Sequence, residues 1–308
     1  MLPVVRNNGQ MRTTALQFFK RRARRILPPY YLATAASLFL IFTIIGQKTG
    51  THWDVSIPVG FKDILTHLVL LQDIFPDTSA TINPTFWSIS VEWRIYFLFP
   101  LIVLAWNRYG PFLTSLVAVL GSLSIQLLLR DVSFFNFSPW GICPHFIGLF
   151  TLGCLAAEIS FSPQSQIDIL QKKLPWNIIT ILGACLLLII SSRGLLLSQK
   201  ILWPLQDLIM GIWSSCLLIT LASQKESLLK RILCWKPLTF CGTFAYSIYL
   251  IHAPLLQVIS QYLLMPLNLS PLMELVFLVM MGLPIILLMS YLFFGWCERP
   301  FLAKKQMR

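Results

Sequence analysis

The sequence predicts an all-α protein, a polytopic bundle of transmembrane helices, and three observations predict this class. Hydrophobic residues make up 56% of the 308 residues and charged residues only 12%, whereas a typical soluble domain carries about 25% charged residues. The mean hydropathy is +0.72. Long apolar windows recur along the whole chain. The charge is too sparse to cover a water-facing surface, so we expect a single membrane-embedded domain over residues 1–308.

Eight apolar windows are long enough to cross a hydrocarbon core of ~30 Å. They lie at about residues 26–46, 86–106, 111–129, 141–159, 176–192, 205–222, 239–258 and 272–295. The segment 62–75 is apolar but too short to span, so it predicts a short interfacial or re-entrant helix.

Basic residues outnumber acidic residues by 24 to 12, which gives a formal net charge of +12. The basic runs lie beside the apolar windows rather than on a folded basic domain, which argues against nucleic-acid binding. An even number of spans puts both termini on one side, and most Lys and Arg residues fall on that side. The positive-inside rule therefore predicts that both termini are cytoplasmic. The seven cysteines form no CxxC pair, so neither a disulfide framework nor a zinc site is expected.

The first apolar window follows a block of cations that contains Arg21, Arg22, Arg24 and Arg25. Such a block can be a topology anchor that contacts anionic lipid. It can equally bind phosphate groups, since a guanidinium donates two parallel hydrogen bonds to phosphate oxygens. A Pro-Pro pair at 28–29 follows at once. We therefore expect the first helix to begin or kink there, with its amide end facing a ligand.

The window 86–106 contains a carboxylate at lipid depth, Glu92. Ser88 and Tyr96 lie one turn to either side on the same helix face. Arg94 projects nearly across the helix, so it is not an obvious intrahelical partner. An ionisable side chain at this depth is costly. Glu92 therefore either clamps two helices together or belongs to a water-accessible reaction site.

The window 239–258 carries His252, with Tyr249 one turn earlier and Pro254 just after it. At ~1.5 Å per residue the imidazole lies ~10 Å below the outer boundary, close to the depth expected for Glu92. A lone histidine is more often a satisfied core residue. An imidazole at this depth can also act as a base, so both interpretations stay open.

We expect the remaining histidines to have structural roles. His145 and Glu158 open and close the window 141–159, and we expect both to be structural. His52 and His67 lie in the outer loop and lack metal-ligand spacing.

Four motifs, in order, resemble those of the acyltransferase 3 family of integral membrane acyltransferases. The family's basic motif FxxRRxxRIxPxY is similar to residues 18–30, and its WSLSxExxFY motif is similar to residues 87–96. Its SYSxYLxHxP motif resembles residues 245–254, where Ala245 replaces the leading serine. The closing ExP signature resembles residues 298–300.

The resemblance implies transfer of an acyl group, commonly acetyl from acetyl-CoA, to a hydroxyl of a cell-surface glycan or related acceptor. It implies catalysis by Glu92 and His252, with no metal. The residues implied to bind the phosphates of acyl-CoA are Arg21, Arg22, Arg24 and Arg25. Those implied to contact substrate are Trp87, Ser88, Tyr96, Tyr246 and Tyr249. The implied partners are membrane lipid and a glycan or lipid-linked sugar acceptor, in what we expect to be a bacterial inner membrane.

The chain departs from the family at its beginning. Family members carry a first span, with a histidine after a basic residue, upstream of the arginine motif. Only 17 residues precede Phe18, and they contain neither a histidine nor a span. We therefore expect either a start further upstream or a truncated and inactive copy.

A different function class also stays open, namely a transporter or flippase for a lipid-linked sugar. In that case Glu92, Arg94 and His252 would be substrate or proton sites. The sequence lacks the paired Gly/Pro-interrupted segments that would indicate inverted repeats, which argues against this class.

Overall fold

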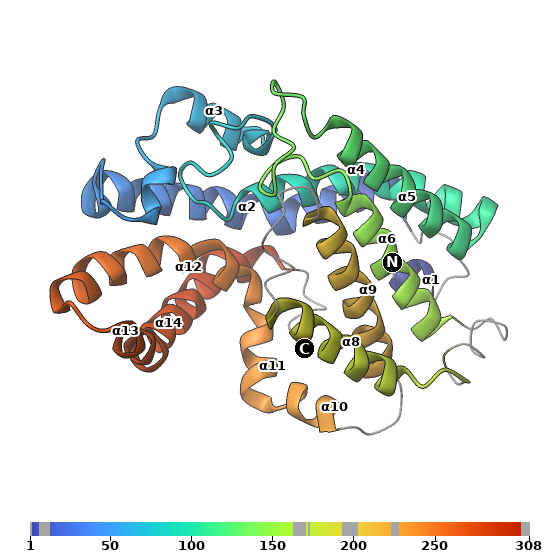
Figure 1. Ribbon diagram of the computed structural model, residues 1–308. Coiled ribbons are helices and arrows are strands. Elements are labelled where there is room, and N and C mark those ends of the chain that lie inside the picture. The colour runs from blue at the N-terminus through green and yellow to red at the C-terminus, as the bar shows by residue number, and fades with distance from the viewer. Residues whose placement is uncertain are drawn as a thin grey trace. The chain divides into compact units, whose positions relative to one another are not determined.

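The structure is a computed structural model, and every regular element that it describes is a helix (Figure 1). The described residues are 2–5, 13–162, 171, 173–192, 203–222 and 228–302. The predicted all-α class is therefore confirmed.

The chain divides into two compact units, which are described separately. The first unit comprises residues 1–15 and 91–232, and the second comprises residues 16–90 and 233–308. One helix, α4 (Trp87–Tyr109), begins in the second unit and continues through the first.

The first unit is a set of packed helices centred on α6. Besides most of α4, its described helices are α1 (Leu2–Val5), α5 (Pro111–Leu129), α6 (Phe146–Phe161), α8 (Trp176–Ser192), α9 (Trp203–Ala222) and α10 (Leu228–Leu233), the last of which ends at the boundary between the units. Both α5 and α9 pack against α6, and α8 packs against α9.

Small side chains let the helices of the first unit approach closely. Ala156 and Ile159 of α6 are buried against Ile219 of α9. Where α5 meets α6, a Cβ atom on Gly148 would lie only 2.8 Å from the Cα atom of Val119. Close contact through small residues is typical of helices that pack within a membrane.

The second unit combines two long helical segments with the connection that precedes α4. Its first part consists of α2 (Ala15–Leu40) with a π-helical turn at Ile41–Ile45, a 3-10 turn at His52–Ser56, α3 (Phe61–Leu68) and a 3-10 turn at Gln72–Ile74. Its second part consists of α11 (Lys236–Thr243), α12 (Ala245–Ile259), α13 (Pro271–Phe277) and α14 (Leu283–Phe293). Short π or 3-10 turns extend these last helices at Ser260–Leu264, Met265–Leu267, Leu278–Gly282, Phe294–Glu298 and Arg299–Phe301. Within this unit α12 packs against α14.

Six described helices are long and apolar enough to cross a membrane. They are Ala15–Ile45, Trp87–Tyr109, Pro111–Leu129, Trp203–Ala222, Ala245–Leu267 and Pro271–Phe301. The two other predicted spans are the apolar helices α6 and α8, with 16 and 17 residues. The predicted short helix at 62–75 is observed as α3 and the 3-10 turn that follows it. These helices make the chain a multi-pass membrane protein.

The predicted start of the first helix at its Pro-Pro pair is wrong, whereas the alternative, a kink at this pair, stays a prediction. α2 starts at Ala15 and continues through Pro28 and Pro29. Proline has no N–H, so the carbonyl oxygens of Arg24 and Arg25 lose their helical donors. Membrane helices tolerate such prolines because neighbouring groups satisfy the freed carbonyls. The amide end of α2 therefore lies at Ala15, and the arginines lie inside the helix.

Backbone geometry also shortens one predicted window and divides another. The window 141–159 is helical only from Phe146. Cys143, with φ of +47°, precedes Pro144, and a residue before proline is disfavoured in the helical region. Phe244 separates α11 from α12 with φ and ψ values of −124° and 25°, outside the helical region.

Candidate active site

His252 lies half-buried in the middle of α12, in the second unit. Its Nδ1 atom is 2.9 Å from the backbone oxygen of Tyr249 and 3.0 Å from that of Ile248. Carbonyl oxygens only accept hydrogen bonds, so Nδ1 carries a proton and donates it. The Nε2 atom then holds the lone pair, and it has no hydrogen-bond partner among the described residues. The helix thus holds His252 in the tautomer that a general base requires.

Tyr249 connects α12 to the beginning of α4. Its hydroxyl donates to the backbone oxygen of Thr85 at 2.6 Å and is also hydrogen-bonded to the hydroxyl of Ser88. The Ser88 hydroxyl also lies 3.3 Å from the Thr85 oxygen, so the two hydroxyls share this acceptor and either can donate in the bond between them. The ring centroids of Tyr249 and His252 are 5.9 Å apart. The structure therefore brings together three of the residues singled out from the sequence.

Asn83 supports this arrangement from the residues just before α4. Its side-chain amide donates to the backbone oxygen of Leu250 at 3.0 Å, and its side-chain oxygen accepts from Thr85. In a regular helix the Leu250 oxygen would accept from residue 254, but Pro254 has no N–H. Asn83 is fully buried and supplies the missing donor. Asn83 was not selected from the sequence. The signal that could have indicated such a donor is Pro254, which leaves the carbonyl oxygen four residues earlier without its helical partner.

Residues 46–86 connect α2 to α4. They form another hydrogen bond to α12, near the C-terminal end of that helix. Thr51 donates to the side-chain oxygen of Gln257 at 3.1 Å, and Gln257 is fully buried. In the same connection, Trp53 packs with Ile41 of the first span in an apolar cluster. The connection is therefore a packed part of the second unit.

The four arginines do not form one patch on α2. Arg21 and Arg24 are exposed, whereas Arg22 and Arg25 are half-buried. Arg22 places its guanidinium 5.6 Å from the ring centroid of Phe18, within cation–π range. The helical spacing explains the division, because residues three apart share a face and adjacent residues do not.

Arg25 is linked to a buried polar pair formed by the third and fourth motifs. The hydroxyl of Ser247 donates to a carboxylate oxygen of Glu298 at 2.5 Å. Both residues are almost completely buried, with 0% and 2% of their surfaces exposed. Arg25 is the cation that acts electrostatically on this carboxylate. Tyr246 adds a second link to α2, since its hydroxyl donates to the backbone oxygen of Ile26 at 3.1 Å. Ser247 and Glu298 were not selected from the sequence.

Glu92 lies in the first unit, on an exposed face of α4. The hydroxyl of Tyr96, one turn later, donates to its carboxylate. Arg94 points elsewhere and donates to the backbone oxygen of Ile142 at 3.5 Å. Trp87 is half-buried in the first turn of α4. A contact between Glu92 and His252 stays a prediction.

The other polar residues of the first unit connect helices. Nε2 of His145 is 2.9 Å from a carboxylate oxygen of Asp207 on α9. The indole of Trp106 donates to the buried carboxylate of Glu158 at 3.2 Å. Among the described residues no group of three or more His, Cys, Asp or Glu side chains is placed to bind a metal ion.

Comparison with known proteins adds a family assignment. Residues 10–291 match the protein-family model described as an acyltransferase domain. The curated relatives include the O-acetyltransferase OatA of Staphylococcus aureus, in strains NCTC 8325 / PS 47, COL and MRSA252. Each is 23% identical over 257 residues, which cover 80% of this chain and 42% of the relative. The chain therefore spans less than half the length of these relatives. No solved structure matches the chain.

Proposed function

This chain belongs to the acyltransferase domain family, and on that premise we propose that it transfers an acyl group, most simply acetyl, from acyl-CoA to a hydroxyl of a cell-surface glycan. One observation carries the proposal. His252 has a protonated Nδ1 held by two backbone carbonyls, which leaves Nε2 as an available base within a candidate transmembrane helix.

In the proposed reaction His252 acts first as a base and then as an acid. Its Nε2 takes the proton from the acceptor hydroxyl while the oxygen attacks the thioester carbonyl carbon. The tetrahedral intermediate collapses as the C–S bond breaks. The imidazolium returns the proton to the departing CoA thiolate, so the enzyme ends in its starting state. The products are the ester and free CoA.

We assign Glu92 a second catalytic role, in which its carboxylate orients the imidazole or positions the acceptor. Tyr96 supports this role because its hydroxyl donates to the carboxylate and holds it in one conformation. A fixed carboxylate loses little conformational entropy when a substrate binds.

The arginines of α2 are proposed to bind the phosphates of the donor. Guanidinium groups suit phosphate oxygens because two N–H groups donate in parallel. Glu298 supports the assignment for Arg25, since its buried carboxylate interacts electrostatically with the guanidinium. The exposed Arg21 and Arg24 can reach a phosphate from the aqueous side.

The acceptor is proposed to contact aromatic and hydroxyl groups of the second and third motifs. The proposed set is Trp87, Ser88, Tyr96, Tyr246 and Tyr249. The relatives are named O-acetyltransferases, which supports a hydroxyl acceptor. We place the protein in a bacterial inner membrane with both termini cytoplasmic, so that the arginines meet acyl-CoA in the cytoplasm.

The direct test is acyl transfer from labelled acetyl-CoA in membranes that contain the protein. We expect His252→Ala and Glu92→Gln to abolish transfer, whereas His52→Ala, an exposed histidine of the α2–α4 connection, leaves it unchanged. Full transfer by both site variants would refute the proposal. Movement of a lipid-linked sugar across the membrane without CoA would instead support the transporter.

A further inference from the structure

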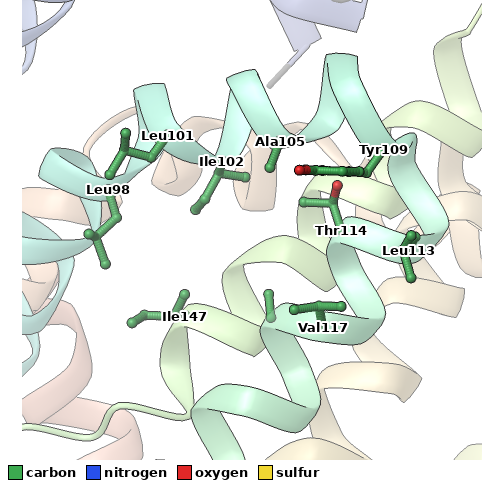
Figure 2. A pocket seen from close by; sticks show the side chains of 10 residues that line it. Leu98, Leu101, Ile102, Ala105, Tyr109, Leu113, Thr114, Val117 and Ile147 are labelled. Carbon is green, nitrogen blue, oxygen red and sulfur yellow. The ribbon is translucent and has the colours of Figure 1, made fainter.

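A cavity of about 530 Å³ lies between α4, α5 and α6 of the first unit (Figure 2). It involves none of the residues assigned to acyl transfer. Its volume falls within the range of about 300–1,000 Å³ that is usual for ligand pockets. Its wall is hydrocarbon from Leu98 on α4 to Ile147 on α6, apart from the hydroxyl-bearing side chains of Tyr109 and Thr114.

The cavity arises from the tight turn between α4 and α5. Only Gly110 separates the two helices, and its φ of +81° is a conformation that side-chain-bearing residues rarely adopt. Figure 2 shows the helices leaving this turn in different directions, with the cavity between them. The small side chains of Ala105 and Ala118 widen the space.

The opening of the cavity faces the hydrocarbon that surrounds the helices. Both α4 and α5 are candidate transmembrane spans. Leu101 and Val117, which line the cavity, are each 61% exposed. An unfilled apolar cavity forfeits dispersion contacts on every wall, and a flexible hydrocarbon chain restores them.

A cation lies next to the end of the cavity. The guanidinium of the exposed residue Arg108 is 5.4 Å from the ring centroid of Tyr109. Figure 2 shows the Tyr109 hydroxyl directed along the cavity toward Ala105. Basic groups between transmembrane helices on the cytoplasmic side attract anionic lipid headgroups. The charge therefore complements a phosphate whose attached chain enters the cavity.

The buried hydroxyl in the wall, that of Thr114, is closed off from the cavity. Thr114 lines the cavity and is only 8% exposed. Its hydroxyl is buried and has no hydrogen-bond partner among the described residues. Because this oxygen is not accessible from the cavity, a ligand there would contact the apolar side chains of the wall rather than the hydroxyl.

We propose that this cavity is a binding site for one acyl chain of an anionic phospholipid, whose phosphate is bound by Arg108. The apolar wall selects the chain and Arg108 selects the headgroup. The proposal does not depend on the acyl-transfer reaction.

The test is photo-crosslinking in lipid nanodiscs with the whole chain. The probe is phosphatidylglycerol with a diazirine in its acyl chain, and labelled peptides are located by mass spectrometry. We expect labelling within residues 98–118. The substitution Ala118→Trp should abolish it by filling the cavity, whereas Leu116→Trp, on an exposed face of the same helix and outside the cavity lining, should not.

The headgroup is tested with a second matched pair. Arg108→Gln should weaken labelling by phosphatidylglycerol about tenfold, as expected for loss of one charge-assisted contact. Arg108→Lys should retain most of it. The control is Arg130→Gln at the other end of α5, an exposed residue paired with Asp131. Melting temperatures establish that each variant is folded.

Three outcomes would overturn the proposal. Equal labelling by a phosphatidylcholine probe with the same chain would identify the occupant as non-selective annular lipid. Equal labelling of the two Trp variants would place the lipid outside the cavity. Displacement of the probe by long-chain acyl-CoA, but not by unlabelled phosphatidylglycerol, would assign the cavity to the tail of an acyl donor.

Discussion

The side-chain amide of Asn83 donates a hydrogen bond to the backbone oxygen of Leu250, 3.0 Å away and 167 positions later in the chain. The bond replaces the helical N–H that Pro254 lacks. It therefore sets the path of α12 in the turns that carry Tyr249 and His252.

Replacing the donor should destabilise the second unit. We expect Asn83→Asp to lower the free energy of unfolding by ~1–3 kcal/mol, because it leaves a buried carbonyl unpaired and places a carboxylate beside it. The exposed Asn107→Asp on α4 is the control. The measurement is thermal unfolding in detergent. In a Pro254→Ala background the helix regains its own donor, so the effect of Asn83→Asp should shrink there; an unchanged effect would contradict this explanation.

The Tyr249–Ser88 pair should couple energetically. Tyr249→Phe removes the hydroxyl that bonds both Thr85 and Ser88, so we expect a fall in kcat as His252 loses its neighbour's fixed position. Ser88→Ala should do less, because it leaves the bond to Thr85 intact. A double-mutant cycle on unfolding should give a coupling of about 0.5–3 kcal/mol. Additive effects of the two substitutions would show that the hydrogen bond has no energetic role.

Glu298 should act on donor binding through Arg25. Glu298→Gln keeps the hydrogen bond from Ser247 but removes the charge that acts on the guanidinium. We expect KM for acyl-CoA to rise about tenfold, which corresponds to ~1.4 kcal/mol, with a smaller change in kcat. Glu274→Gln on α13 is the matched control. An unchanged KM would remove Arg25 from the donor site.

His67 should make stability depend on pH. Burial lowers the pKa of His67 to about 4, whereas the ordinary value is 6.5. Between these two values the unfolded chain binds more protons than the folded chain, so stability falls as pH decreases through this window, by up to ~3 kcal/mol. Melting temperatures from pH 7.5 to 4.5 measure the loss. His67→Gln should flatten the profile, whereas His52→Gln should preserve it; a parallel decline in both variants would assign the effect to other groups.

The close packing of α5 against α6 can be tested with two glycines of one helix. A Cβ atom on Gly148 would lie 2.8 Å from Val119 and 2.9 Å from the hydroxyl of Ser122. We expect Gly148→Ala to lower the free energy of unfolding by ~1–3 kcal/mol through overpacking. Gly153→Ala meets nothing within 4 Å and should be neutral. Equal stability of the two variants would mean that the helices can separate freely.

Hydropathy predicted where apolar helices occur because the period and length of apolar residues are local properties of the sequence. Helix ends were predicted less well, since they depend on backbone details such as the conformation of Cys143 before Pro144. The pairing of Tyr249 with Ser88 could not be derived from spacing, because it joins residues 161 positions apart. Ser247 and Glu298 were missed for the same reason. Their hydrogen bond forms only when α12 packs against the end of the last span.

The hydrogen bonds between the α2–α4 connection and α12 affect which changes of length the protein can accept. Surface loops ordinarily accommodate inserted residues because few of their backbone groups are committed. Here Thr51, Asn83 and Thr85 are all bonded to α12. An insertion between any two of these positions would shift the register of the others against the helix that carries His252. A linker or epitope tag is therefore better placed outside residues 51–85, even though this segment lies between two spans.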